Sequence, residues 1–303
     1  MTAEVRAAAG VLEPDAWRAL ADAHAARVDA LVAPHLERRR SGVPHPVHDF
    51  LFTYYSQRPA QLRRWHPGFG TGLADAEEHG TLKGYAVRDG VAAVTAEHVR
   101  AQRPLLVALA RLLRATASRA PAYSCFGLHE WAMVHRSAEH GTRHPWPLRL
   151  GADATDAVVE SHRVTCSHFD AFRFFTPSAR PLNTLSPGRD DRDAFEQPGC
   201  LHAGMDLYGK VAVRLSPMIC SDLVADAFEL AWDIRILDMR AAPYDMTGIR
   251  LDPTGDEWTP VKIETPEGKA EYVRLQREFS GRAAPIRQRL IEECERLLSA
   301  TGV

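Results

Sequence analysis

The chain lacks the excess of positive charge that most nucleic-acid-binding proteins carry. Its 303 residues include 37 lysines and arginines against 39 aspartates and glutamates, and the sequence pI is about 6.7. Proteins whose affinity for DNA or RNA comes mainly from neutralising phosphates are usually clearly basic. The composition therefore argues against a general nucleic-acid binder, while a local basic patch stays open.

Cysteine is scarce, and its spacing excludes further classes. The five cysteines stand at positions 125, 166, 200, 220 and 294, an odd number without a CxxC pair. We therefore expect neither a disulfide framework nor a cysteine-rich zinc module, and we expect a reducing, cytoplasmic location. The first ten residues lack a cationic start with an apolar core, and no apolar run approaches the roughly 18 residues that a membrane helix needs. We expect no membrane partner.

The hydrophobic residues, 45% of the chain, recur largely at helical spacing. This pattern predicts helices over 15–39, 95–118 with a kink near Pro104, 125–140 and 221–240, and a short strand over 261–264. We predict a mainly α protein, a compact bundle of about eight helices with a short strand or two. We expect one helical domain over residues 1–303, with 1–43 as an N-terminal helix and linker and 44–303 as the core.

Fourteen histidines are a high number for this length, and the stretch 158–177 holds several side chains suited to a site. If the stretch is extended, Glu160, His162, Cys166, His168 and Asp170 lie on one face. If it is helical, His162 and Cys166 pair at i,i+4 and Asp170 follows one turn later. In either geometry His162, Cys166 and Asp170 point the same way. We predict a buried polar site, metal-binding or acid–base.

Two further segments supply histidine beside acid. His202 and Asp206 stand at i,i+4, a spacing that lets both side chains reach one ion, or that forms a local hydrogen bond. His129 and Glu130 are adjacent, so on a helix they diverge by about 100° and we expect only one of them at any given site.

Other residues are candidates for binding a substrate. Trp65 lies in a segment, 54–72, that combines aromatic residues, arginines and glycines suited to a flat or anionic ligand, or to a plain surface loop. Arg173, and the turn with Arg240, Tyr244 and Asp245, are further candidates for anchoring a substrate. The irregular segment 176–198 is long for a loop, and we expect it to cover the site.

Several long motifs resemble one bacterial, largely actinobacterial, protein family, which carries the label 3-methyladenine DNA glycosylase. The resemblance covers most of the chain from about Pro44 onwards. The motifs are HPVHDFLFTYYSQRPAQLRRWHPG, CFGLHEWAMV, DAVVESHRVTCSHFDAFRFFTPSARPLN, EQPGCLHAGMDLY and LDMRAAPYD. The label implies an N-glycosylase that excises alkylated purines from DNA. Such an enzyme needs a carboxylate, here Asp170 or Asp49, and aromatic residues for a flipped base, here Tyr54, Tyr55 or Trp65.

The residues themselves favour a metal-dependent enzyme that acts on a small molecule, an oxidoreductase rather than a hydrolase. Imidazole and carboxylate ligands suit non-haem iron or haem, with zinc as a further choice. The predicted ligands are His129, His162, His168, His202 and Asp206. The predicted acid–base groups are Asp170, Glu160 and Glu130. A DNA glycosylase and a non-catalytic ligand-binding protein are the alternatives, and the oligomeric state is open.

Overall fold

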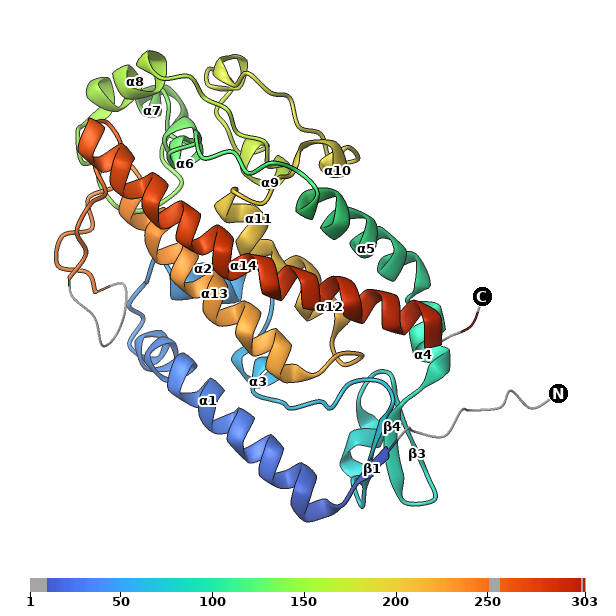
Figure 1. The fold of residues 1–303 in the computed structure, drawn as a ribbon. Helices are drawn as coiled ribbons and strands as arrows, with labels where there is room; N and C mark the ends of the chain where they lie inside the picture. Colours follow the sequence, from blue (N-terminus) through green and yellow to red (C-terminus); the bar gives the residue numbers. More distant parts are fainter. Residues whose placement is uncertain (1–9, 251–256, 301, 303) are drawn as a thin grey trace.

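The computed structural model describes residues 10–250, 257–300 and 302, and within them the chain is mainly helical, as predicted (Figure 1). The long helices are α1 (Pro14–Arg40), α5 (Arg103–Ala117), α13 (Ser221–Ala241) and α14 (Pro266–Ala300). The shorter helices are α2 (His48–Tyr54), α3 (Pro59–Leu62), η1 (Glu77–Thr81), α4 (Ala96–Ala101), α6 (Leu128–Ala132), α7 (Ser137–His140), α8 (Ala152–Ser161), α9 (Phe169–Phe172), η2 (Arg180–Leu182), α10 (Arg192–Phe195), α11 (Leu201–Asp206), the π-helix η3 (Leu207–Ala212) and α12 (Val213–Leu215). None of the helices in the described part is long and apolar enough to cross a membrane.

The prediction of a compact bundle of about eight helices is too simple, because two of the predicted helices are divided. The helix expected over 95–118 forms α4 and α5, which part at Gln102, two residues before Pro104. Proline has no backbone N–H to donate and cannot continue the helix before it. The helix expected over 125–140 forms α6 and α7, separated by a turn in which Arg136 adopts a φ of 55°.

A small sheet is the main feature that the periodicity did not predict. It consists of β1 (Gly10–Leu12), β2 (Thr71–Ala74), β3 (Tyr85–Arg88) and β4 (Val91–Val94), in the order β1-β2-β4-β3. β1 pairs parallel to β2 and the other pairs are antiparallel. The sheet lies at the end of the molecule where α1 begins (Figure 1), and the indole of Trp17 ties the two together by donating to the carbonyl of Ala74 at 2.9 Å.

The strand predicted over 261–264 is wrong. The Val261 N–H donates to the carbonyl of Arg240 at 2.8 Å, and the Ile263 N–H donates to that of Val261 at 3.0 Å. These bonds lie in the connection between α13 and α14, and within the described residues this backbone pairs with no strand.

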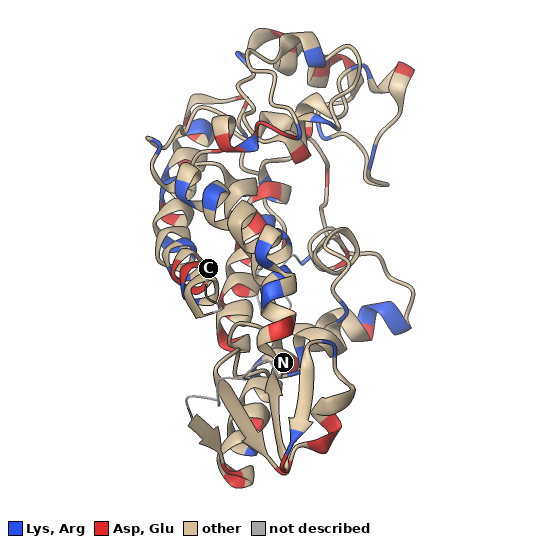
Figure 2. Ribbon diagram, turned by 90° about the vertical axis from the view of Figure 1, so that its right-hand side faces the viewer, with Lys and Arg blue, Asp and Glu red and all other residues tan. Residues whose placement is uncertain are grey.

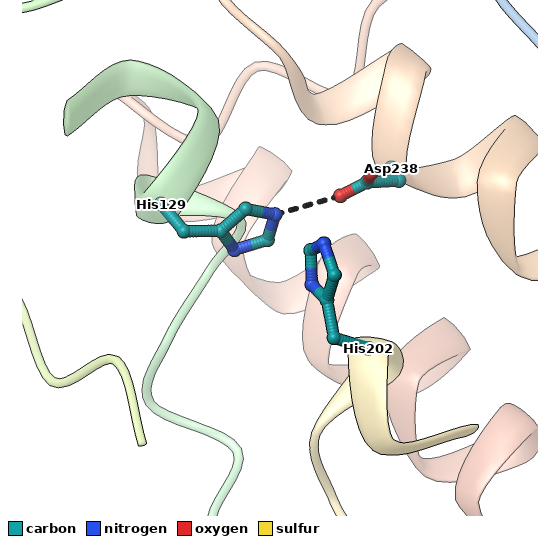
Figure 3. Close-up of side chains that lie close together, drawn as sticks. All are labelled: His129, His202 and Asp238. Atoms are coloured by element: carbon teal, nitrogen blue, oxygen red, sulfur yellow. Dashed lines mark hydrogen bonds and ion pairs between the residues drawn. The ribbon is translucent and has the colours of Figure 1, made fainter. Parts of the chain in front are cut away.

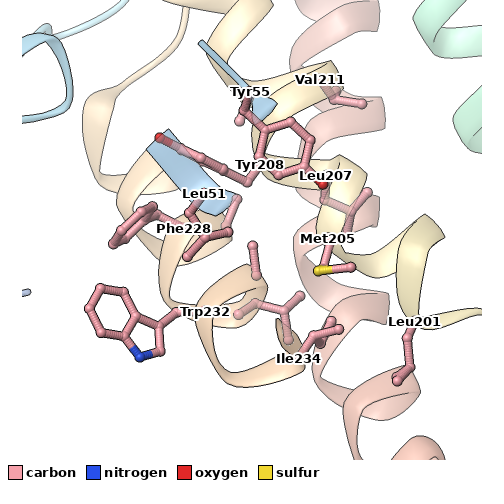
Figure 4. Close-up of a cluster of buried hydrophobic side chains, with 14 of the residues drawn as sticks. Leu51, Tyr55, Leu201, Met205, Leu207, Tyr208, Val211, Phe228, Trp232 and Ile234 are labelled. Carbon is pink, nitrogen blue, oxygen red and sulfur yellow. The ribbon is translucent and has the colours of Figure 1, made fainter. Parts of the chain in front are cut away.

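The hydrophobic core is centred on α13, which packs against α11, η3 and α14, while α14 also packs along α5. Figure 4 shows Phe228 and Ile234 of α13 among the buried side chains of α11, η3 and α2. The approach of α11 to α13 depends on Gly204, because a Cβ there would lie 2.7 Å from the Ile234 Cδ1 atom. This close packing brings the side chains of α11 next to those of α13.

Candidate metal and substrate site

Three buried or half-buried side chains from three helices meet beside the core: His129 of α6, His202 of α11 and Asp238 of α13 (Figure 3). One ligand atom from each lies within 4.8 Å of the others. The His129 Nε2 atom donates a hydrogen bond to Asp238 Oδ1 at 2.9 Å, and the His129 and His202 rings meet edge to face with centroids 4.4 Å apart. We call these three residues the His–Asp centre.

Arg235, one turn before Asp238 on α13, holds the carboxylates around the centre. Its guanidinium is 1% exposed and donates to Asp238 Oδ2 and, at 2.9 Å, to Glu130 Oε1. Its plane also lies over the Phe50 ring, 4.0 Å from the ring centroid. Asp238 Oδ2 is therefore engaged by Arg235, while Oδ1 faces the two histidines.

Burial and charge set the protonation of the centre. Burial alone would lower the pKa of His129, but the charge of Asp238 and the hydrogen bond to it raise that pKa well above 6.5. Burial would raise the pKa of Asp238, while His129 and Arg235 hold it well below its usual range. Burial, and then repulsion by His129, lower the pKa of His202 well below 6.5. At neutral pH His202 is thus a neutral imidazole, and none of the described residues hydrogen-bonds to its ring.

His202 lines a cavity of about 360 Å³ that is suited to a flat ligand. Aromatic side chains form much of its wall: Phe50, Tyr54, Trp146 and Phe174. The carboxylates of Glu130 and Asp170 also reach it. Glu130 Oε2 is buried without a hydrogen-bond partner among the described residues, so it is free to accept from a bound molecule. An apolar, aromatic cavity with a few convergent polar groups is the usual form of a small-molecule site.

A second ionic cluster lies next to His202. His168 Nε2 donates to Asp206 Oδ2 at 3.1 Å and lies 3.7 Å from Glu196 Oε1. Arg192 donates to Glu196 at 2.5 Å and to Asp206 at 3.0 Å. The His202 ring therefore contacts a histidine of each cluster, with centroids 4.4 Å from that of His129 and 5.3 Å from that of His168.

The position of Asp206 in this second cluster depends on the π-helix that follows it. The hydroxyl of Tyr55 donates to Asp206 Oδ1 at 3.2 Å. Tyr55 fits there only because residue 209 is glycine, since a Cβ at Gly209 would lie 1.9 Å from the Tyr55 ring. π-helical turns are rare and often found at functional sites.

Most of the predicted ligands come together, although in two groups. His129 and His202 join the His–Asp centre, and His168 and Asp206 join the second cluster. The i,i+4 pair on α11 is therefore shared between two neighbouring clusters and does not converge on one point. Glu130 and His129 both belong to the network of the centre through Arg235, although only one was expected there.

The expectation that His162, Cys166 and Asp170 point the same way is wrong. α8 ends at Ser161 and α9 begins at Phe169, so the stretch between them follows neither a helical nor a strand period. The His162 ring donates to the carbonyl of Val158 at 2.6 Å, and Glu160 is exposed and pairs with His135 at 3.2 Å. Neither of these predicted residues reaches the centre. Asp170 does reach the large cavity, held by Arg173 at 2.8 Å and by Lys210 at 3.6 Å.

The predicted substrate-binding residues are scattered. Arg173 lies beside the cavity through its ion pair with Asp170 and its contact with the Phe174 ring. Tyr244 is buried with its ring against that of His144, which lines the cavity. Trp65 is in the core. Arg240 binds Thr259 and Glu271, and Asp245 caps Thr247, both outside the cavity lining.

The sequence interpretation missed four charged residues: Arg235, Asp238, Arg192 and Glu196. Asp238 had a readable signal, because helical spacing places it on the apolar face of α13 with Ile234. The segment 176–198, expected to cover the site, supplies Arg192 and Glu196 to the second cluster. No sequence pattern marked those two residues, since they lie in or beside a single turn of helix within a long loop.

Comparison of the chain with protein-family models, curated proteins and solved structures gave no match. The resemblance to the family labelled 3-methyladenine DNA glycosylase therefore stays a prediction, and the function is argued from the site alone.

Proposed function

We propose that the protein is a metal-dependent enzyme that acts on a small, flat molecule, with His129, His202 and Asp238 as the metal ligands. The observation that carries the proposal is His202: a neutral imidazole, unpaired within the described residues, that lies between a histidine–aspartate pair and an aromatic cavity. A neutral imidazole with a free lone pair is the form of histidine that binds metal ions.

The donor set fits a first-row transition metal. Two histidines and one carboxylate are the ligands of the facial triad of non-haem iron(II) enzymes, and zinc enzymes also use three such ligands with an open position. Two atoms bound about 2.1 Å from one ion lie roughly 3.0–3.4 Å apart. The 2.9 Å between His129 Nε2 and Asp238 Oδ1 is close to that range, and a bound ion would take the place of the proton that His129 shares with Asp238. Haem needs only one axial histidine and would leave the clustering of all three ligands unexplained, so non-haem iron is preferred.

The surroundings fit the role of supporting residues. Arg235 engages one oxygen of Asp238 and so orients the other toward the histidines, as partners of metal ligands commonly do. When bound, the ion supplies Lewis-acid or redox chemistry at the inner end of the cavity. Glu130 Oε2 is positioned to take or hold a proton of the substrate, and the aromatic wall holds a flat ring and excludes water.

Metal analysis tests the proposal. We expect freshly purified protein to contain about one iron or zinc ion per chain. The variants His129→Ala, His202→Ala and Asp238→Asn are expected to lose that ion. His135→Ala is the matched control, because His135 is also a buried histidine paired with a carboxylate but its partners are Ser178 and Glu160, outside the centre. A metal-free preparation that still turns over its substrate, or equal metal content in all variants, overturns the proposal.

A second candidate, an N-glycosylase that excises alkylated purines, is favoured by the lining of the aromatic cavity beside His202. The cavity combines aromatic faces with the carboxylates of Glu130 and Asp170, and Tyr54 and Asp49 also line it. A 3-alkylated adenine in DNA carries positive charge, which aromatic faces and carboxylates both stabilise. Of the other residues that the resemblance implies, Tyr55 and Trp65 are core residues outside this lining.

This candidate is tested by release of methylated adenine from alkylated duplex DNA in the presence of a chelator. Asp170→Asn is expected to abolish the release, and Arg282→Gln, an exposed surface change, is the control. DNA binding must also weaken with salt, since phosphate contacts release counterions. Figure 2 shows acidic and basic residues interspersed along the helices, so any DNA-binding surface is local. Binding of a ligand with no turnover under either assay would leave a non-catalytic binding protein.

A further inference from the structure

A second site, independent of the proposed function, is indicated by Arg287 in the middle of α14. The side chain is 2% exposed, although arginine keeps its charge in proteins. Its Nε and Nη2 atoms are buried, and neither finds an acceptor among the described residues. Burial lowers the pKa of Arg287, as expected for a cation that lacks a close counter-charge. A buried charge is normally paired, so this guanidinium needs a partner.

The guanidinium lines a cavity of about 30 Å³ between α14, α5 and the π-helix η3. In Figure 1 α14 runs beside α5. Residues of these two helices and of η3 line the cavity. A space of this size holds one water molecule or one ion of similar size. Thr116 of α5, also buried, brings a hydroxyl to the same cavity.

The two carboxylates that line this cavity are already paired with other cations. Glu196 and Asp206 line the cavity, but Arg192 pairs with both of them, at 2.5 and 3.0 Å. His168 adds a hydrogen bond to Asp206 at 3.1 Å. Neither carboxylate forms a hydrogen bond or ion pair with Arg287, and the longer-range attraction of Glu196 raises the pKa of Arg287 by less than burial lowers it.

The rest of the cavity wall adds positive charge. Lys210 and Arg214 both line it. Lys210 faces Asp170 at 3.6 Å, but Asp170 also binds Arg173 at 2.8 Å, so one carboxylate serves two cations. The potential inside the cavity is therefore positive.

We propose that Arg287 binds a small inorganic anion, of the size of chloride, in this cavity. The anion accepts from the two unpaired guanidinium nitrogens and from the hydroxyl of Thr116. Because the cavity is small, we expect it to prefer a monatomic anion over phosphate, sulfate or the carboxylate of an organic molecule. A water molecule would accept hydrogen bonds from the N–H groups of Arg287 but would leave its positive charge without a counter-charge.

Chloride dependence of stability tests this. Thermal unfolding is followed in sodium chloride and in sodium gluconate at equal ionic strength and pH. An anion that binds only the folded state stabilises it in a saturable way, so we expect the midpoint to rise by about 3–6 °C in chloride. Bromide is expected to raise the midpoint as chloride does. Sulfate, apart from its general stabilising salt effect, is expected to raise the midpoint no more than gluconate does.

Two substitutions on one helix separate this site from general salt effects. Arg287→Met removes the buried charge and is expected to abolish the difference between chloride and gluconate. Arg274→Met removes an exposed arginine of the same helix, and this variant is expected to keep the difference between chloride and gluconate. Should Arg287→Met fail to fold, Arg287→Lys serves instead, with a weaker chloride response. Equal midpoints for the wild type in both salts, or a full chloride response in Arg287→Met, overturn the proposal.

Discussion

Replacement of Arg235 by methionine is expected to destabilise the fold strongly, because it strands two buried carboxylates. Arg235 is 1% exposed and binds Glu130, which is 4% exposed, and Asp238, which is 1% exposed. Methionine keeps much of the apolar stem but no charge. Removing one partner from a buried ion pair costs about 3–5 kcal/mol. For a protein of this size that loss lowers the unfolding temperature by roughly 6–15 °C.

The double variant Glu130→Gln/Arg235→Met tests the reasoning, because the second change removes one of the two stranded charges. Asp238 keeps its bond to His129 in both variants. The double variant is therefore expected to be more stable than Arg235→Met alone by about 1–3 kcal/mol, although glutamine is introduced into a buried position. Urea unfolding of the four members of this cycle measures the coupling energy.

Arg282→Met is the control for loss of an arginine, since its ion pair with Asp233 is about 43% exposed on both sides. A surface pair of this kind contributes at most about 1 kcal/mol. If the losses of unfolding free energy for Glu130→Gln and Arg235→Met simply add, Arg235 does not stabilise the charge of Glu130. In that case the account of the centre as one charge network fails.

Three further outcomes are expected. Burial lowers the pKa of His66 from 6.5 to about 4, so the folded state loses stability as pH falls below 6.5, by about 2 kcal/mol at pH 5. Urea unfolding of the wild type and of His66→Asn at pH 7 and pH 5 should therefore show a pH effect that is smaller in the variant by that amount. Gly209→Ala places a methyl group in the Tyr55 ring and is expected to lower the unfolding temperature by several degrees in a thermal scan. Glu130→Gln is expected to reduce kcat at least about 100-fold with the metal content unchanged, once a substrate is in hand, and an unchanged kcat would remove Glu130 from the chemistry.

Helical periodicity predicted the mainly α class and the long helices α1 and α13 because their buried residues recur at helical spacing. It did not predict the breaks at Gln102 and in the turn after α6. A few residues with special backbone geometry decide such breaks, and the flanking apolar pattern continues across them. The sheet was missed for a related reason. Its strands are three or four residues long, too short for an alternating pattern to stand out.

The site was half predictable for a different reason. His129, His168, His202 and Asp206 stood out because the chain is rich in histidine and several of its histidines stand close to acids in the sequence. Their partners come from remote segments, and local spacing holds no information about which remote side chain completes a cluster. Asp238 is 109 residues from His129 in the sequence and 2.9 Å from it in the fold.

The two clusters next to His202 have the same composition, and this makes His202 the informative residue. Each contains one histidine, one arginine and two carboxylates: His129, Arg235, Glu130 and Asp238 in one, and His168, Arg192, Glu196 and Asp206 in the other. Buried ionic groups of this kind are often no more stabilising than well-packed apolar side chains. Stability alone therefore does not account for either cluster. A balanced cluster needs no additional imidazole, and yet His202 lies beside both, neutral and facing the aromatic cavity. The presence of a neutral His202 beside two charged networks is explained if its lone pair binds an ion or a proton that the substrate needs.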